Sequence, residues 1–227
     1  MSQIVFEEVS HSYDGLKVLD NIELSLTQRR IGITGLNGSG KSTLVRMING
    51  LVLPSHGKVL VDGINAAKKA KQVRNKVGFI FAHPTNQIIM PTVVEDVEFS
   101  LRKRVKDKAD RKSQALTYLS KYGLAPYANQ SPYCLSAGQQ QLLAVTAVMA
   151  TEPQIIVADE PTGLLDLRNT YKLRQLFNSL SAQMIVVSHD FDLLQDMERV
   201  IVLDNGKVVA DDDPQAALSF YNELAMR

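Results

Sequence analysis

The sequence contains little cysteine, no long apolar run and almost no net charge. Its single cysteine, Cys134, excludes an internal disulfide and a cysteine-rich metal site, so we expect a packing role for it. The longest apolar run, residues 142–150, is far shorter than the ~20 residues that span a bilayer and is typical of a buried helix. Residues 1–7 show neither a basic start nor an apolar signal core. We therefore expect one α/β domain that stays in the cytosol.

The charge is small in total but unevenly placed. A net charge of +1 argues against a nucleic-acid footprint over the whole protein. Residues 66–112, however, carry twelve Lys or Arg residues against five acids. Two interpretations are open for this basic run: a solvated helical face, or a surface that lies near anionic lipid.

A phosphate-binding loop is the clearest motif in the chain. It fits the spacing of a glycine, four residues and then Gly-Lys-Ser, and its members are Gly35, Leu36, Asn37, Gly38, Ser39, Gly40, Lys41, Ser42 and Thr43. A β-prone segment precedes it and a helical pattern follows, which disfavours the alternative of a chance glycine-rich turn. Lys41 would reach the outer phosphates of a nucleoside triphosphate, and the Ser42 hydroxyl would hold Mg²⁺.

Two further segments place polar side chains at strand ends. The strand 155–158 ends in Asp159 and Glu160, and the strand 184–187 leads to His189. Because parallel strands end at the same sheet edge, these groups should meet near the phosphate loop, which indicates metal binding or proton transfer for the two acids and phosphate contact for His189. The alternatives are solvent-facing acids and a structural histidine.

The remaining patterns predict an α/β fold that begins with antiparallel strands. Strand patterns occur at residues 4–10, 18–26, 57–63, 77–81, 155–158, 184–187, 200–203 and 207–209. Helical patterns occur at residues 43–48, 93–122 with a charged interruption, 142–150, 169–180 and from 214 onward. Tyr13, in the first turn, is either a core aromatic or a residue that stacks on adenine. Ser136 is an N-cap candidate and marks a second helix N-terminus able to accept an anion.

Together these segments resemble the ATPase subunits of ATP-binding-cassette (ABC) transporters over nearly the whole chain. The phosphate loop is similar to the family's Walker A motif, residues 155–159 to Walker B, Asp166 to the D-loop aspartate and His189 to the switch histidine. The family's signature sequence resembles Leu135, Ser136, Ala137, Gly138 and Gln139.

The resemblance implies a P-loop NTPase fold of the ABC ATPase type. It implies a mixed, largely parallel central sheet, an N-terminal antiparallel β part and a helical subdomain within a single domain, residues 1–227. Residues 1–82 and 151–227 would form the core and the antiparallel part. Residues 83–150 would form the Q-loop and the helical subdomain.

The resemblance also implies a mechanism with ATP and Mg²⁺. Two ATPase domains would pair head to tail, with nucleotide between the Walker A loop of one and the signature helix of the other. Lys41, Glu160 and His189 would be catalytic, and Ser42 and Asp159 would hold the metal. Glu160 would polarise the attacking water and His189 would hold the γ-phosphate. Nucleotide contacts outside the loop would come from Tyr13 and Val18.

Two residues depart from the family pattern. Ala137 stands where glycine is usual, which is tolerable unless its φ is positive. Ala82 stands where the Q-loop glutamine is expected, and its methyl group cannot ligate metal. His83 or Gln87 could substitute in part, and we expect slow basal hydrolysis that depends tightly on partners.

Residues 86–97 resemble the corresponding segment of energy-coupling-factor (ECF) ATPases, which drive vitamin and transition-metal uptake, with biotin the best candidate here. The implied partners are a second ATPase subunit, either the same chain or a related one, a transmembrane coupling subunit and a substrate-binding membrane subunit, with no nucleic acid. The protein would lie on the inner face of the cell membrane. The alternative, a soluble ABC ATPase acting on nucleic acid or ribosomes, lacks the expected internal repeat or sustained heptads. A nucleotide-binding module without turnover would have lost Lys41 or Glu160.

Overall fold

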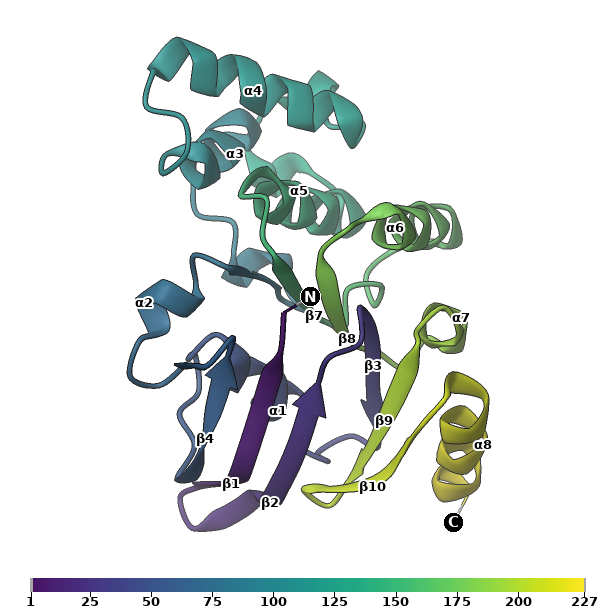
Figure 1. The fold of residues 1–227 in the computed structure, drawn as a ribbon. Coiled ribbons are helices and arrows are strands. Elements are labelled where there is room, and N and C mark those ends of the chain that lie inside the picture. The colour runs from purple at the N-terminus through teal and green to yellow at the C-terminus, as the bar shows by residue number, and fades with distance from the viewer. Residues whose placement is uncertain (1, 227) are drawn as a thin grey trace.

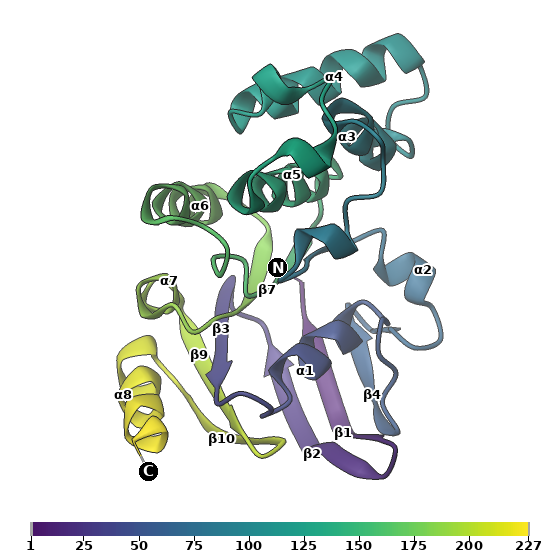
Figure 2. The ribbon, with the colours of Figure 1, turned by 180° about the vertical axis from the view of Figure 1, so that it is seen from behind.

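The computed structural model of the protein describes residues 2–226, and its two β-sheets lie on either side of helix α1 (Lys41–Ile48; Figures 1 and 2). The smaller sheet is antiparallel and has the strand order β2-β1-β4-β5. Its strands are β1 (Ile4–Tyr13), β2 (Leu16–Leu26), β4 (His56–Val61) and β5 (Ile64–Asn65). Apolar residues of both sheets and of α1 form one buried cluster, so this helix is held from two sides.

The larger sheet is mixed and has the strand order β10-β9-β3-β8-β7-β6. Only β10 runs antiparallel to its neighbour. The strands are β3 (Arg30–Gly35), β6 (Val77–Ile80), β7 (Ile155–Asp159), β8 (Gln183–Val187), β9 (Arg199–Asp204) and β10 (Lys207–Asp212). Every residue of β7 and β8 is buried, as expected for central parallel strands covered on both faces.

The other face of this sheet is covered by α6 (Leu167–Ser179), α7 (Phe191–Gln195) and α8 (Pro214–Ala225), which form a second buried cluster with the sheet and with part of α5 (Ala137–Ala150). The strands β9 and β10 meet in the expected turn, where Asn205 and Gly206 both have positive φ. This turn lies against the phosphate loop, because the Gly206 N–H donates to the Ser39 carbonyl at 3.2 Å.

A third buried cluster belongs to the helical region at the top of Figure 1, formed by α3 (Val93–Leu101), α4 (Lys108–Lys121) and α5 (Ala137–Ala150). Helix α5 joins this region to the sheet. Its residues Leu143 and Ala150 pack in the helical cluster, whereas Val145 and Val148 pack beneath the sheet. Any shift of the helical region against the sheet therefore acts on α5. The short helix α2 (Ala70–Val73) lies between β5 and β6 in the sequence.

The expected α/β fold, with an antiparallel N-terminal sheet and a largely parallel central sheet, is confirmed. The N-cap expected at Ser136 is confirmed, because its side chain accepts from the Gln139 N–H and α5 starts directly after it. Helix α6 begins at Leu167 and not at the predicted 169, because Asp166 caps a polar first turn and accepts from the Asn169 N–H. Cys134 is exposed, so its expected packing role is wrong. Within residues 2–226, none of the helices has the length and apolar character to cross a membrane.

Candidate functional site

The phosphate loop connects β3 to α1, and its glycines are required by the backbone. Gly35 has φ 141°, and a Cβ there would stand 1.9 Å from the Leu203 carbonyl oxygen. Gly40 has φ 99°, and a Cβ there would stand 2.8 Å from the Val18 carbonyl oxygen. The loop is therefore pressed between β9 and β2, and a side chain at either glycine would displace it.

The Lys41 side chain folds back onto the start of the phosphate loop. Its Nζ donates to the Gly35 carbonyl at 2.7 Å and to the Leu36 carbonyl at 2.8 Å. Burial lowers the pKa of the Lys41 ammonium, and the charges of Glu160 and Asp159 oppose that shift. The ammonium thus lies against two loop carbonyls at the N-terminus of α1, where a cation and the free N–H groups of a helix end together favour an anion.

Two oxygen donors meet beside the loop at the carboxyl end of β7. The Ser42 hydroxyl donates to Asp159 Oδ1 at 2.9 Å, and the Asp159 side chain is only 1% exposed. In residues 2–226, no three His, Cys, Asp or Glu side chains gather into a metal site of their own. Hydroxyl and carboxylate oxygens suit Mg²⁺, which keeps several waters and shares its shell with phosphate, so these two residues fit that ion.

The sequence analysis missed Arg46, whose Nη2 bonds Asp159 Oδ2 at 3.2 Å. Its signal was available, because Arg46 follows Ser42 by four residues and therefore lies on the same face of α1. The buried Asp159 carboxylate is thus held from two points on one helix.

Glu160 and His189 face each other at the same sheet edge. Pairing of Asp159 with Val187 aligns the ends of β7 and β8, and His189 Nε2 lies 3.4 Å from Glu160 Oε1. Glu160 has φ 50°, a sparsely populated conformation for a non-glycine residue. Burial raises the pKa of Glu160 and lowers the pKa of His189. The imidazole is therefore neutral near pH 7, with one nitrogen that donates and one that accepts.

Tyr13 is the last residue of β1 and is 47% exposed. Its ring packs edge-on against His11, with 4.4 Å between the ring centroids. This exposure rules out the core interpretation of Tyr13. Val18 lies nearer the loop, since its carbonyl faces Gly40.

The signature segment caps the N-terminus of α5. The Ser136 side chain accepts from the Gln139 N–H, and Gln139 Oε1 accepts from the Ser136 N–H at 2.9 Å. Ala137 is the first helical residue and its φ is not positive, so the extra methyl causes no backbone strain. Over the described residues, no hydrogen bond or ion pair joins this segment to the phosphate loop of the same chain.

Next to Ala82, two glutamines hold the backbone of Phe81. Gln87 Oε1 accepts from the Phe81 N–H at 3.4 Å while its Nε2 donates to the Ala144 carbonyl at 3.2 Å. Gln141 Nε2 donates to the Phe81 carbonyl at 3.3 Å. The Gln87 amide is therefore occupied by structural bonds, which argues against its use as a substitute metal ligand.

A groove of about 530 Å³ lies between β6, α3 and α5. Its wall includes two exposed apolar side chains, Ile89 at 62% and Phe99 at 42% exposure. Beneath them the Asp96 carboxylate accepts from the backbone N–H groups of Ile89 and Met90, at 3.0 and 3.2 Å. Burial raises the pKa of Asp96. This carboxylate fixes the segment that carries Ile89.

Part of the basic run lines the same groove. Arg74 and Lys103 line it, and Lys103 Nζ donates to Asn75 Oδ1 at 2.9 Å, which ties the end of α3 to the end of α2. One member has a structural role, because Arg104 donates to the Ala150 carbonyl at the end of α5. One basic residue from each half of the run, Arg74 and Lys103, therefore meets at this groove.

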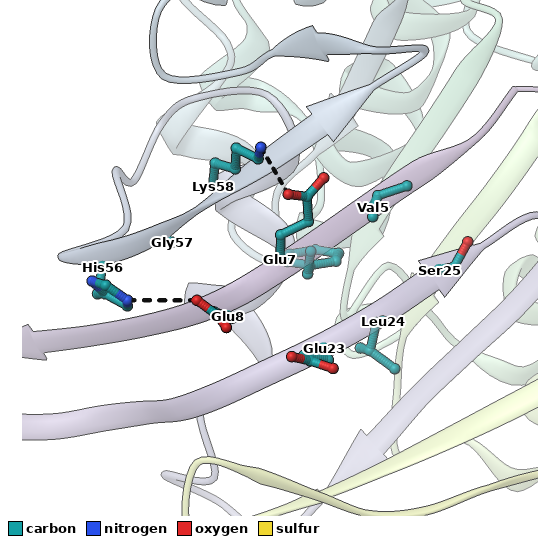
Figure 3. Close-up of a pocket in the computed structure, with 10 residues that line it drawn as sticks. Val5, Glu7, Glu8, Glu23, Leu24, Ser25, His56, Gly57 and Lys58 are labelled. Carbon is teal, nitrogen blue, oxygen red and sulfur yellow. Dashed lines mark ion pairs between the residues drawn. The ribbon is translucent and has the colours of Figure 1, made fainter.

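A separate shallow hollow lies on the antiparallel sheet (Figure 3). Lys58 pairs with Glu7 at 2.8 Å, and His56 approaches Glu8 at 3.9 Å. The hollow shares no residue with the site around the phosphate loop.

The comparisons with known proteins agree on one family. The family model described as ABC transporter matches residues 19–163. A putative ABC transporter ATP-binding protein of Bartonella henselae is 46% identical, over 97% of this chain and 98% of that protein. The biotin transport ATP-binding protein BioM of Rhizobium etli is 39% identical, over 98% of this chain and 99% of that protein. The energy-coupling factor transporter ATP-binding protein EcfA1 of Oenococcus oeni is 34% identical, over 89% of this chain and 75% of that protein.

Solved structures show the same likeness. The dimeric post-hydrolysis state of the ATP-binding cassette MJ0796, bound to ADP and Pi, superposes with a TM-score of 0.85 at 31% identity, over 93% of this chain and 98% of that chain. The cbiO1 structure from Clostridium perfringens, part of the ABC transporter complex cbiONQ, gives a TM-score of 0.80 at 26% identity, over 95% of this chain and 90% of that chain. With the phosphate loop, the carboxylates and the histidine gathered at one sheet edge, these matches show that the chain belongs to the ABC transporter family as one of its ATP-hydrolysing subunits.

Proposed function

We propose that this chain is the ATPase subunit of an ECF-type importer and that two copies hydrolyse ATP at sites shared between them. The observation that carries the proposal is the convergence at one sheet edge: Ser42 lies 2.9 Å from Asp159, and His189 lies 3.4 Å from Glu160. Both pairs stand at the phosphate loop, and Lys41, Glu160 and His189 are all present in the chain.

ATP would bind with its outer phosphates in the loop. The backbone N–H groups and the Lys41 ammonium neutralise phosphate charge, and Ser42 and Asp159 hold Mg²⁺. When bound, the ion screens the charge that builds up on the phosphate oxygens. Tyr13 and Val18 would contact the adenosine part.

Hydrolysis requires a water aligned with the γ-phosphorus. The Glu160 carboxylate accepts a hydrogen bond from that water and polarises it, a contribution of roughly 10² to 10⁴ in rate. His189, neutral because of burial, donates one N–H to a γ-phosphate oxygen and holds the group in line for attack.

One face of the loop needs a second chain. The N-terminus of α5, a helix of 14 residues, carries backbone N–H groups and a partial positive charge suited to the exposed side of the γ-phosphate. The dimeric MJ0796 cassette with ADP and Pi supports this arrangement. We propose that the Ser136–Gln139 segment of the second copy closes each site.

A membrane coupling subunit would dock in the groove between β6, α3 and α5. Exposed Ile89 and Phe99 provide apolar anchors, and Arg74 and Lys103 provide a basic rim suited to the anionic inner leaflet. The cbiO1 structure, described as part of a cbiONQ complex, supports such an assembly. The protein would then work at the inner face of the cell membrane, together with a substrate-binding membrane subunit.

The cargo would be a vitamin or a transition-metal ion, and biotin is the first candidate because BioM is 39% identical over nearly the full length of both chains. The test places this chain in vesicles with the membrane subunits of a biotin transporter that lacks its own ATPase subunit. ATP-dependent uptake of labelled biotin is expected with the wild type and not with Glu160→Gln. ATP hydrolysis without biotin uptake would reject biotin while leaving the ATPase proposal standing.

A further inference from the structure

Tyr221 lies on the last helix, outside every motif, yet its hydroxyl reaches the histidine of the site. The Tyr221 hydroxyl oxygen lies 3.0 Å from His189 Nδ1. The phenol is only 8% exposed, and its ring stacks on Phe191 with 5.9 Å between centroids and 27° between planes. Packing therefore fixes the hydroxyl at this nitrogen.

The other ring nitrogen decides the direction of this hydrogen bond. His189 Nε2 faces Glu160 Oε1 at 3.4 Å. A proton on Nε2 attracts the carboxylate, whereas a bare Nε2 would set its lone pair against a negative oxygen. With Nε2 protonated, neutral His189 accepts at Nδ1 and the phenol must donate.

The surroundings of the phenol agree with this direction. Burial raises the pKa of Tyr221, so the hydroxyl keeps its proton. The buried Thr34 hydroxyl has no hydrogen-bond partner among the described residues, yet it lies close enough to the phenol to lower its pKa. It can donate to the oxygen of Tyr221 while Tyr221 donates to His189.

We propose that Tyr221 is a positioning residue: its hydroxyl donates to Nδ1 of His189 and thereby keeps the proton on Nε2, the nitrogen directed at Glu160 and the γ-phosphate. The proposal deepens the function above and rests on the role given there to His189. It makes helix α8 part of the catalytic arrangement, because a residue 32 positions further along the chain acts together with Glu160 on the tautomer of the histidine.

The tautomer can be measured without turnover. In the full chain labelled with ¹⁵N-histidine, His189 is one of four histidines and is assigned by the signal lost in His189→Ala. At pH 7.5, the Nδ1 shift of the wild type is expected to be that of an unprotonated nitrogen. Tyr221→Phe should move it towards that of a protonated nitrogen, whereas Tyr118→Phe, which loses a hydroxyl bonded to Glu152 at 3.1 Å, should not. A protonated Nδ1 in the wild type, or an unchanged shift in Tyr221→Phe, overturns the proposal.

Kinetics separate positioning from packing. Tyr221→Phe keeps the ring and is expected to lower kcat for ATP about three- to tenfold with little change in KM, the effect of one hydrogen bond. Tyr221→Leu should lose the same hydroxyl effect and also lower the melting temperature. In a His189→Ala background, Tyr221→Phe should have no further effect on kcat. An unchanged kcat in Tyr221→Phe overturns the kinetic part of the proposal.

The two proposals fail differently. If His189→Ala keeps the wild-type rate, the role of His189 in the proposed function is wrong, while the nitrogen shifts still decide whether Tyr221 sets the tautomer. If His189→Ala is inactive and Tyr221→Phe changes neither shift nor rate, only the positioning role of Tyr221 is wrong.

Discussion

The phosphate-loop site and the groove beside Ala82 differ in how their polar groups are used. At the loop, polar side chains meet in two pairs at the sheet edge, Ser42 with Asp159 and His189 with Glu160. Both pairs are placed to contact one charged ligand. At the groove, the Gln87 amide forms its hydrogen bonds with backbone groups of Phe81 and Ala144. The first region is organised for chemistry, and the second for holding a surface in shape.

This difference teaches where the two tasks of the protein lie. The loop site carries the strained φ of Glu160 and buried charges, which cost folding free energy and serve a ligand. The groove presents exposed apolar side chains over a buried carboxylate, which serve a partner. Helix α5 links them, because it begins with the signature segment and its Ala147 and Val148 line the groove.

The largest effect should come from Glu160. Glu160→Gln removes the carboxylate that polarises water, so kcat should fall by roughly 10² to 10⁴ while ATP binding persists. Glu152→Gln is a matched control, since Glu152 also has φ 50° and lies outside the site. A Glu160→Gln variant that turns over ATP at the wild-type rate would break the assignment of chemistry to this region.

Changes in the groove should weaken binding of the membrane subunit and leave ATP hydrolysis intact, the opposite of the effect of Glu160→Gln. Replacing Ile89 and Phe99 together by Glu should weaken binding of the membrane subunit by about 30-fold or more, the effect of losing one apolar hot spot. ATP hydrolysis by the isolated chain should stay within about twofold of wild type. The control is Leu53→Glu, which changes an exposed apolar side chain outside the groove. If binding is unchanged, the groove is not the docking surface.

The glutamine beside Ala82 should matter to folding and not to metal binding. Gln87→Leu leaves the Phe81 N–H without its acceptor and should lower the free energy of unfolding by about 1–2 kcal/mol. Urea denaturation measures this, with Gln175→Leu on the exposed face of α6 as control. A changed Mg²⁺ requirement in Gln87→Leu would contradict the structural role of this amide.

The smallest effect concerns Ala82 itself. Ala82→Gln adds one polar group just after β6 and should raise the ATPase rate about two- to fivefold, as one net hydrogen bond of about 0.5–1 kcal/mol would. Hydrolysis is measured with and without the membrane subunit. If both rates are unchanged, this position does not limit turnover.

Local patterns predicted much of the fold and most of the groups at the site. The loop spacing located Lys41 and Ser42, and apolar runs that end in polar residues located Asp159, Glu160 and His189, because parallel strands end together. The N-cap pattern at Ser136 located the start of α5, but the start of α6 was placed too late, because a polar capped turn does not follow an apolar period.

Other features depended on contacts between distant segments, which no local pattern encodes. Tyr221 reaches His189 only because α8 packs against the sheet edge, and on its own helix it resembles any other core aromatic. The use of Gln87 likewise follows from its contact with Ala144, 57 residues away. The exposure of Tyr13 and Cys134 could not be predicted from the sequence, because it depends on which segments pack beside them.

The most direct test of the account mixes two inactive variants. Lys41→Ala disables the phosphate loop. Gly138→Asp places a negative charge at the signature helix, where a Cβ would make only ordinary contacts, the nearest at 3.5 Å. If each site joins the loop of one copy to the signature of the other, a mixed dimer holds one intact site, and the mixture should recover up to about a quarter of the wild-type rate. A mixture as inactive as either variant alone would contradict a site shared between two copies of this chain.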